Sequence, residues 1–174
     1  MGIAEDLAYV IPRPNLLQRS VRAVASTRPG AWGLSRTLPG LDRAMARVSR
    51  GRTTLAEVLA GLPIVVLTTT GRKSGRRRPA QLVALPVGDT LAFLGTNFGQ
   101  AGTPAWALNL EADPRATVTH REITVDVVAR PPSATERGEV LARAADVYVG
   151  YPKYLDRVTA RHVRVFVLDR PATP

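Results

Sequence analysis

Residues 67–78 read Leu-Thr-Thr-Thr-Gly-Arg-Lys-Ser-Gly-Arg-Arg-Arg, so five of the eight residues from Gly71 to Arg78 are cationic. The apolar run before them, residues 63–67, and the three threonines favour a β-strand. Gly71 and Gly75 permit a tight turn, because glycine adopts positive φ without strain. The stretch therefore predicts a strand that ends in a basic turn. That turn is either a site for a phosphate or carboxylate or a solvated hairpin turn.

The composition is that of a globular protein with one domain. The chain has 174 residues, of which 45% are apolar and 22% charged, enough to build its own hydrophobic core. It has no cysteine, which excludes disulfides and thiolate nucleophiles. The two histidines, His120 and His162, are far apart, so we expect no metal site. No signal peptide or membrane-spanning run is recognisable, and we expect a cytoplasmic protein.

The net charge of +10 predicts an acidic partner. Nucleic acid, an anionic lipid surface and a polyanionic small molecule all fit this charge. We expect no nucleic acid, because only 5% of residues are aromatic and they do not alternate with arginines as a stacking platform requires.

The first 52 residues predict an arm and basic amphipathic helices. From Asn15, a plausible N-cap, Leu17, Val21 and Val24 fall on one predicted face, with Arg19 and Arg22 on the polar side. A break is expected at residues 28–30. A second helix, residues 38–50, has one apolar and one arginine-rich face. It either covers the domain's own core or lies on an anionic membrane surface, which would make the protein peripherally membrane-associated.

The rest of the chain, residues 53–174, predicts strands in hairpins with helices outside them. Thr103 as N-cap with Pro104 at the first helical position predicts a helix start. Ser133 and Glu136 form a capping box, and residues 148–154 are aromatic and turn-rich. An antiparallel sheet closing into a small barrel, within one structural domain, fits this order. The predicted strands are residues 63–70, 81–86, 91–95, 116–120, 123–129 and 163–168.

No catalytic motif is present. The chain lacks a Gly-x-Ser-x-Gly elbow and a Walker loop, and its carboxylates are scattered singly. An enzyme with this sequence would therefore take its reactive group from a cofactor.

Several segments together resemble one family. Residues 67–75, with Arg78, resemble the signature of the deazaflavin-dependent nitroreductases, which are split β-barrel proteins that use reduced coenzyme F420. Residues 95–100, 104–114 and 150–154 are similar to further segments of that family in the same order. The resemblance covers roughly residues 28–170 and implies an α+β fold with an antiparallel split β-barrel and peripheral helices, of the FMN-binding split-barrel type.

The resemblance also implies a cofactor site. F420 ends in a phosphodiester and an oligoglutamate tail, which is a polyanion suited to charge-assisted bonds from the basic turn. Asn109 is a candidate phosphate or ribityl contact, and Trp106 either flanks the cofactor or belongs to the core. The helix start near Pro104 favours a phosphate. The implied cofactor-binding residues are Arg72, Lys73, Ser74, Arg78, Thr96, Asn97, Pro104, Ala105, Trp106 and Asn109.

Tyr151 and Tyr154 are the implied catalytic residues, which stack on a substrate or donate a hydrogen bond to its reduced oxygen; the alternative is that both are structural. The chain departs from the family at Pro79-Ala80-Gln81 and at Asn97, where many members have lysine. The expected function is hydride transfer from F420H2 to a quinone, nitroaromatic or activated alkene by a monomer or homodimer. The alternatives are a non-catalytic F420 carrier and an FMN-dependent split-barrel oxidoreductase.

Overall fold

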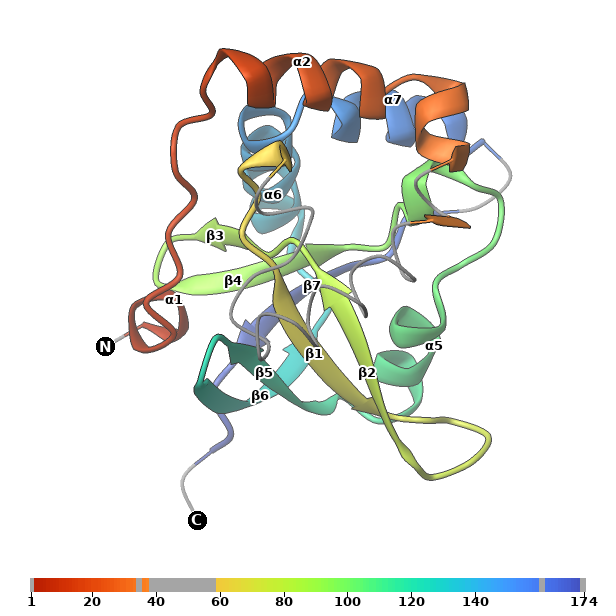
Figure 1. Cartoon of the computed structure of the whole chain (residues 1–174). Helices are drawn as coiled ribbons and strands as arrows, with labels where there is room; N and C mark the ends of the chain where they lie inside the picture. The colour runs from red at the N-terminus through yellow and green to blue at the C-terminus, as the bar shows by residue number, and fades with distance from the viewer. Residues whose placement is uncertain (1, 34–35, 38–58, 160–161, 173–174) are drawn as a thin grey trace.

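Seven antiparallel strands form one sheet at the centre of the molecule (Figure 1). The computed structural model describes residues 2–33, 36–37, 59–159 and 162–172. The strand order is β2-β1-β5-β6-β7-β4-β3, and the sheet is not closed into a full barrel. The strands are β1 Val65–Thr70, β2 Arg77–Leu82, β3 Leu85–Val87, β4 Thr90–Leu94, β5 Arg115–His120, β6 Ile123–Arg130 and β7 Val165–Asp169.

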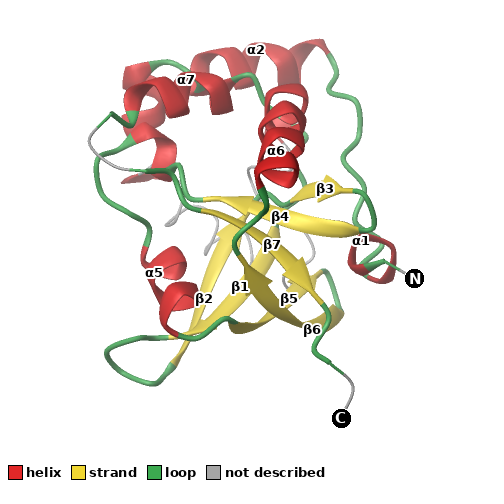
Figure 2. Cartoon of the chain, turned by 180° about the vertical axis from the view of Figure 1, so that it is seen from behind, coloured by secondary structure: helices red, strands yellow, loops and turns green. Residues whose placement is uncertain are grey.

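Helices cover the sheet at three places. Figures 1 and 2 show α2, α6 and α7 gathered beyond the end of the sheet that carries β3 and β4, while α5 lies beside β2 and α1 beside β4. The α+β split-barrel fold expected from the sequence is confirmed. The helices are α1 Ile3–Asp6, α2 Leu16–Ala25, the 3₁₀ turn η1 Asn97–Gly99, α5 Ala105–Ala112, α6 Ala134–Val147 and α7 Gly150–Arg157.

The predicted hairpin around the basic turn is confirmed, with Thr70 opposite Arg77 in the β1–β2 pair. The predicted single strand at residues 81–86 is wrong, because β2 ends at Leu82 and β3 begins at Leu85. The reason is a side chain from the N-terminal arm. The Tyr9 hydroxyl accepts from the backbone N–H of Ala84 at 3.2 Å and lies 2.9 Å from the Pro63 carbonyl oxygen. Ala84 is thereby held outside the strand ladder.

The start of α2 is as predicted, but its buried face is not. Asn15 Oδ1 accepts from the Gln18 backbone N–H at 2.8 Å, within a complete capping box. Leu17 and Val24, expected to be buried, are 69% and 66% exposed, whereas Arg22 is only 5% exposed. The helix therefore buries one of its two arginines, Arg22, and exposes two of its apolar residues.

Three other boundaries differ from those predicted. Residues 28–33 are helical, so the break expected at residues 28–30 lies instead at Ser26 and Thr27. Pro104, not Thr103, is the N-cap of α5. Residues 150–157 form a helix, α7, where a turn-rich segment was expected. The capping box at Ser133 is confirmed, and the predicted helix at residues 38–50 lies outside the described residues.

The hydrophobic core has two parts. One packs against the sheet and includes Leu67, Phe93, Trp106, Val118 and Leu168. The other joins α6 and α7 to β3, β4 and β7, and it contains the three tyrosines of the α6–α7 corner. None of the helices described is long and apolar enough to cross a membrane.

The buried guanidinium of Arg22 joins three segments. Its Nε donates to the Ala60 carbonyl at 2.6 Å, Nη2 to Gly61 at 3.0 Å and Nη1 to Val147 at 2.9 Å. Val147 is the last residue of α6, whose terminal carbonyls have no partner within the helix. Burial lowers the pKa of Arg22, but an arginine remains charged. All of its bonds in the described structure go to neutral carbonyl oxygens.

We expect Arg22→Met to lower the free energy of unfolding by roughly 2–5 kcal/mol, because it leaves buried carbonyls without donors. Denaturant unfolding measures this change. Arg19→Met is the matched control, since Arg19 is exposed on the same helix; it should shift stability by no more than about 0.5 kcal/mol. Equal effects of the two substitutions would contradict the assigned role of Arg22.

We expect the folding stability to depend on pH through a carboxyl group at the start of α6, that of Glu136. Arg130 Nη2 donates to Glu136 Oε1 at 2.6 Å and its Nε to Asp169 Oδ2 at 2.7 Å. Hydrogen bonds from Arg130 and from the Ser133 backbone lower the pKa of Glu136 from 4.5 to about 2. A carboxyl whose pKa is lower in the folded state stabilises the fold above its unfolded pKa. This contribution is lost as the pH falls through the folded pKa.

We therefore expect Glu136→Gln to have a lower melting temperature than wild type at pH 7. The difference should shrink between pH 4.5 and pH 2, since wild-type Glu136 becomes protonated there. Thermal unfolding followed by circular dichroism at several pH values measures it. Glu139→Gln, at an exposed position of α6, is the control; a difference that stays constant with pH would contradict the prediction.

Candidate active site

The basic turn has a defined backbone conformation. Gly71 N donates to the Arg76 carbonyl at 2.8 Å, and Gly75 N donates to the Gly71 carbonyl at 2.7 Å. Gly75 has φ of 65°, where glycine is favoured. A Cβ on Gly71 would lie 2.7 Å from Ser74 Oγ. Glycine at position 75 therefore suits the turn, and a side chain at position 71 would displace that of Ser74.

Asn109 on α5 fastens this turn to the body of the protein. Its Oδ1 accepts from the Arg72 backbone N–H at 3.1 Å, and its Nδ2 donates to Thr69 Oγ1 at 2.9 Å. The residue is 6% exposed. In this structure the Asn109 amide thus holds the basic turn against α5, a role that the sequence interpretation did not foresee.

A groove of about 500 Å³ lies along the turn. Four exposed polar side chains line it, those of Arg72, Lys73, Ser74 and Arg78. The start of α5 forms its other wall with Ala105, Trp106 and Asn109. Such an arrangement suits a phosphate or carboxylate, because cations and a helix N-terminus both attract anions.

The other two arginines of the turn are not among the residues that line this groove. Arg77 Nη2 donates to Thr117 Oγ1 at 2.9 Å on strand β5. These two arginines are therefore less well placed than Arg72, Lys73 and Arg78 to replace the lysine that many family members have at position 97.

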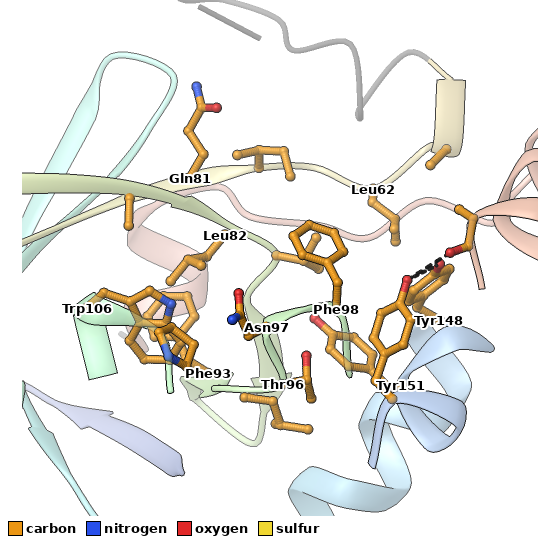
Figure 3. Close-up of a pocket in the computed structure, with 18 of the residues that line it drawn as sticks. Leu62, Gln81, Leu82, Phe93, Thr96, Asn97, Phe98, Trp106, Tyr148 and Tyr151 are labelled. Atoms are coloured by element: carbon orange, nitrogen blue, oxygen red, sulfur yellow. Dashed lines mark hydrogen bonds between the residues drawn. The ribbon is translucent and has the colours of Figure 1, made fainter. Parts of the chain in front are cut away.

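An apolar cavity of about 400 Å³ adjoins the groove. Figure 3 shows Trp106 and Phe93 on one side of it and Tyr148 and Tyr151 on the other. Residues of α2, β2, β4, α5 and α7 all contribute. Ala80, Ala105 and Trp106 line both the cavity and the groove, so the two spaces meet there. The site therefore has an apolar end and a cationic end.

Trp106 forms the wall at this junction. Its ring makes edge-to-face contacts with Phe93 and Phe166, each at 6.0 Å between centroids, and only 8% of the residue is exposed. Trp106 is a core residue, as one of the two alternatives from the sequence expects, and it also lines the site; its contact with the cofactor stays a prediction.

Three tyrosines lie together at the far end of the cavity. Tyr148 donates to the Tyr154 hydroxyl at 3.0 Å, since Tyr154 itself donates to the Ala25 carbonyl at 3.0 Å. In the described part of the chain, no hydrogen bond joins the Tyr151 hydroxyl to another residue. Burial raises the pKa of all three hydroxyls, so they remain protonated and can donate hydrogen bonds near neutral pH.

All the residues singled out from the sequence lie at this site. Tyr151, Tyr154, Thr96, Asn97 and Pro104 line the cavity, and the others line the groove or both spaces. Sequence reasoning missed Tyr148, although its spacing of three from Tyr151 could have placed it on the same side of the chain. No sequence signal marked Phe93 or Leu82. No cluster of histidine and acidic residues that could hold a metal occurs within the described ranges.

Known proteins are similar to this chain in sequence and fold. The model of the F420H(2)-dependent quinone reductase family matches residues 41–170. A solved structure described as an F420-H2 dependent reductase (FDR-A) is 30% identical with a TM-score of 0.56, and the match covers 62% of this chain and 94% of that one. A structure described as a domain-swapped dimer is 27% identical with a TM-score of 0.58, covering 81% and 99% of the two chains.

A more distant structure shares the fold alone. It is a heme binding protein from Mycobacterium smegmatis, 15% identical with a TM-score of 0.50, and the match covers 91% of this chain and 52% of that one.

Proposed function

Because the chain belongs to the F420H(2)-dependent quinone reductase family, we propose that it transfers a hydride from reduced F420 to a quinone in the apolar cavity. It is an F420-dependent reductase, and coenzyme F420 is its cofactor. The family description favours a quinone as acceptor over a nitroaromatic or an activated alkene. The observation that carries the proposal is the meeting of an apolar cavity with a cationic groove at Trp106.

The residues present fit F420. Its phosphodiester and glutamate carboxylates require cations, and Arg72, Lys73 and Arg78 line the groove. Its ring system requires an apolar space that continues from that groove, which the cavity beyond Trp106 provides. Reduced F420, when bound, supplies the hydride. FMN has a shorter anionic part and would use fewer of these cations.

The chain's own residues supply positioning and a hydrogen-bond donor, and the reduced quinone takes its proton from solvent on release. The apolar lining excludes water from the reacting groups. Hydride addition to a quinone leaves negative charge on its oxygen, which a hydrogen-bond donor stabilises. Tyr151 is our candidate donor, because its hydroxyl is protonated and is not used in another bond that the structure describes. Tyr148 and Tyr154 hold the corner in which Tyr151 lies.

We also propose that the protein forms a homodimer, on the basis of the related structure described as a domain-swapped dimer. Light scattering on the purified chain decides this, and a monomer mass at working concentration would contradict it.

Binding and turnover test the function. Fluorescence anisotropy should show tighter binding of F420 than of FMN or single-stranded DNA, and the reverse order would contradict the assignment of the groove. Oxidation of F420H2 should then depend on menadione. If F420 binds but no quinone, nitroaromatic or enone is reduced, the protein is a carrier and not a reductase.

We expect Lys73→Ala to weaken F420 binding by roughly 5-fold at low ionic strength, because one cation is lost from the groove. The loss should shrink at high salt, where exposed charges are screened. Arg76→Ala is the control, since Arg76 belongs to the same turn but is not among the groove residues; it should have a smaller effect. A salt-independent loss in Lys73→Ala would mean that Lys73 acts through structure.

We expect Tyr151→Phe to lower kcat roughly 10²-fold, because the hydrogen-bond donor to the charge that develops on the quinone oxygen is removed, with F420 binding unchanged. Steady-state kinetics with menadione measures this. Tyr154→Phe is the comparison, since its hydroxyl already donates to the Ala25 carbonyl; it should lower stability more than kcat. A larger loss of kcat in Tyr154→Phe than in Tyr151→Phe would reverse these roles.

A further inference from the structure

Phe98 lies in an unusual backbone conformation beside the cavity. Three consecutive residues have positive φ, namely Asn97 at 49°, Phe98 at 55° and Gly99 at 76°. Glycine adopts this conformation readily, but a bulky residue such as phenylalanine seldom does. A non-glycine residue in this region costs on the order of 1–3 kcal/mol, and it persists only where the surroundings enforce it.

Contacts with neighbouring residues hold the loop of residues 97–99 in this conformation. A Cβ on Gly99 would lie 3.1 Å from Arg157 Cδ and 3.3 Å from Tyr154 Cα, so the loop backbone lies directly against α7. Arg157 is itself fixed, because its Nη2 donates to the Ser26 carbonyl at 2.6 Å. On the other side, Asn97 Nδ2 donates to the Gly102 carbonyl at 3.0 Å.

The result is an aromatic ring inside the site. Phe98 lines the cavity, and its ring meets that of Tyr154 edge to face at 6.2 Å. In Figure 3 it lies between the wall of Trp106 and Phe93 and the side formed by Tyr148 and Tyr151. The ring therefore occupies space in the cavity that Tyr151 also lines.

The apolar cavity is small for the ligands that it would receive. The cavity measures about 400 Å³, near the lower end of the range of about 300–1,000 Å³ for ligand sites. Under the proposed function it receives both the cofactor ring and the acceptor. One phenyl ring therefore decides how large an acceptor can approach the tyrosines.

We propose that Phe98 is a specificity-determining residue that restricts the site to compact acceptors, such as a quinone without a bulky ring substituent. The inference rests on the proposed function, and it assigns to the strained loop the task of placing this ring. The loop conformation aims the ring into the cavity, and the contacts with α7 keep it there.

The test is a size series at position 98, in which Phe98→Gly, Phe98→Leu and Phe98→Trp are compared with wild type. Glycine opens the cavity and adopts φ of 55° without strain, whereas leucine and tryptophan change the size of the side chain at the same strained φ, so the three variants together separate side-chain size from backbone strain. The kcat/KM for a bulky naphthoquinone, relative to that for menadione, should rise roughly 10-fold or more in Phe98→Gly. It should rise less in Phe98→Leu and fall in Phe98→Trp.

Calorimetric Kd values for the same two quinones give a second readout that does not depend on turnover. Their ratio should shift in the same direction as the ratio of kcat/KM. A Kd ratio that does not change in Phe98→Gly would overturn the role of Phe98, whatever the activity. Wild-type protein that binds quinones but never oxidises F420H2 would instead overturn the proposed function, and the Kd series would still decide on Phe98.

Discussion

A single buried guanidinium group connects the segments from which the candidate active site is built. Arg22 comes from α2, and its three donors reach the Ala60 and Gly61 carbonyls and the last carbonyl of α6. The apolar cavity is lined by residues that lie close to these hydrogen bonds in the sequence, namely Val21, Ala25 and Ala60. One charged group thus satisfies three carbonyls that would otherwise be buried without donors. Because α2 is held in this way, the Ala25 carbonyl is in place to accept the hydrogen bond from Tyr154.

The two ends of the site are built by different kinds of interaction. At the cationic end, the hairpin of β1 and β2 presents exposed side chains, and one buried amide, that of Asn109, fastens the turn to α5. At the apolar end, close packing of aromatic rings sets the shape, and strain is retained at Asn97 and Phe98. The cationic end suits a long polyanion that is partly in water, while the apolar end would exclude water from the proposed hydride transfer.

Much of the fold and of the site could be predicted from the sequence, because the signals were local or came as ordered motifs. Glycines flanking a basic run predicted the turn, and the capping residues Asn15 and Ser133 predicted two helix starts. The family resemblance then brought together side chains from the basic turn, the loop at Thr96 and the start of α5. Elsewhere, hydrogen bonds between residues far apart in the sequence made predictions from local patterns wrong. Tyr9 interrupts the strand expected at residues 81–86, and Arg22 is buried where periodicity placed it on the polar side.

The sequence by itself determined the charge of the groove and the turn that displays it, because glycine conformation and side-chain charge belong to the residues themselves. The cofactor followed from the family resemblance of the ordered motifs. Only the tertiary structure decided which tyrosine hydroxyl is available and where the cavity ends. Tyr148, Tyr151 and Tyr154 are chemically alike, and the Ala25 carbonyl distinguishes them by accepting a bond from Tyr154. Phe98 lines the site, and the next residue, Gly99, packs against Arg157, a residue almost sixty positions away in the chain. Such contacts depend on how distant segments fold together, which no local pattern records.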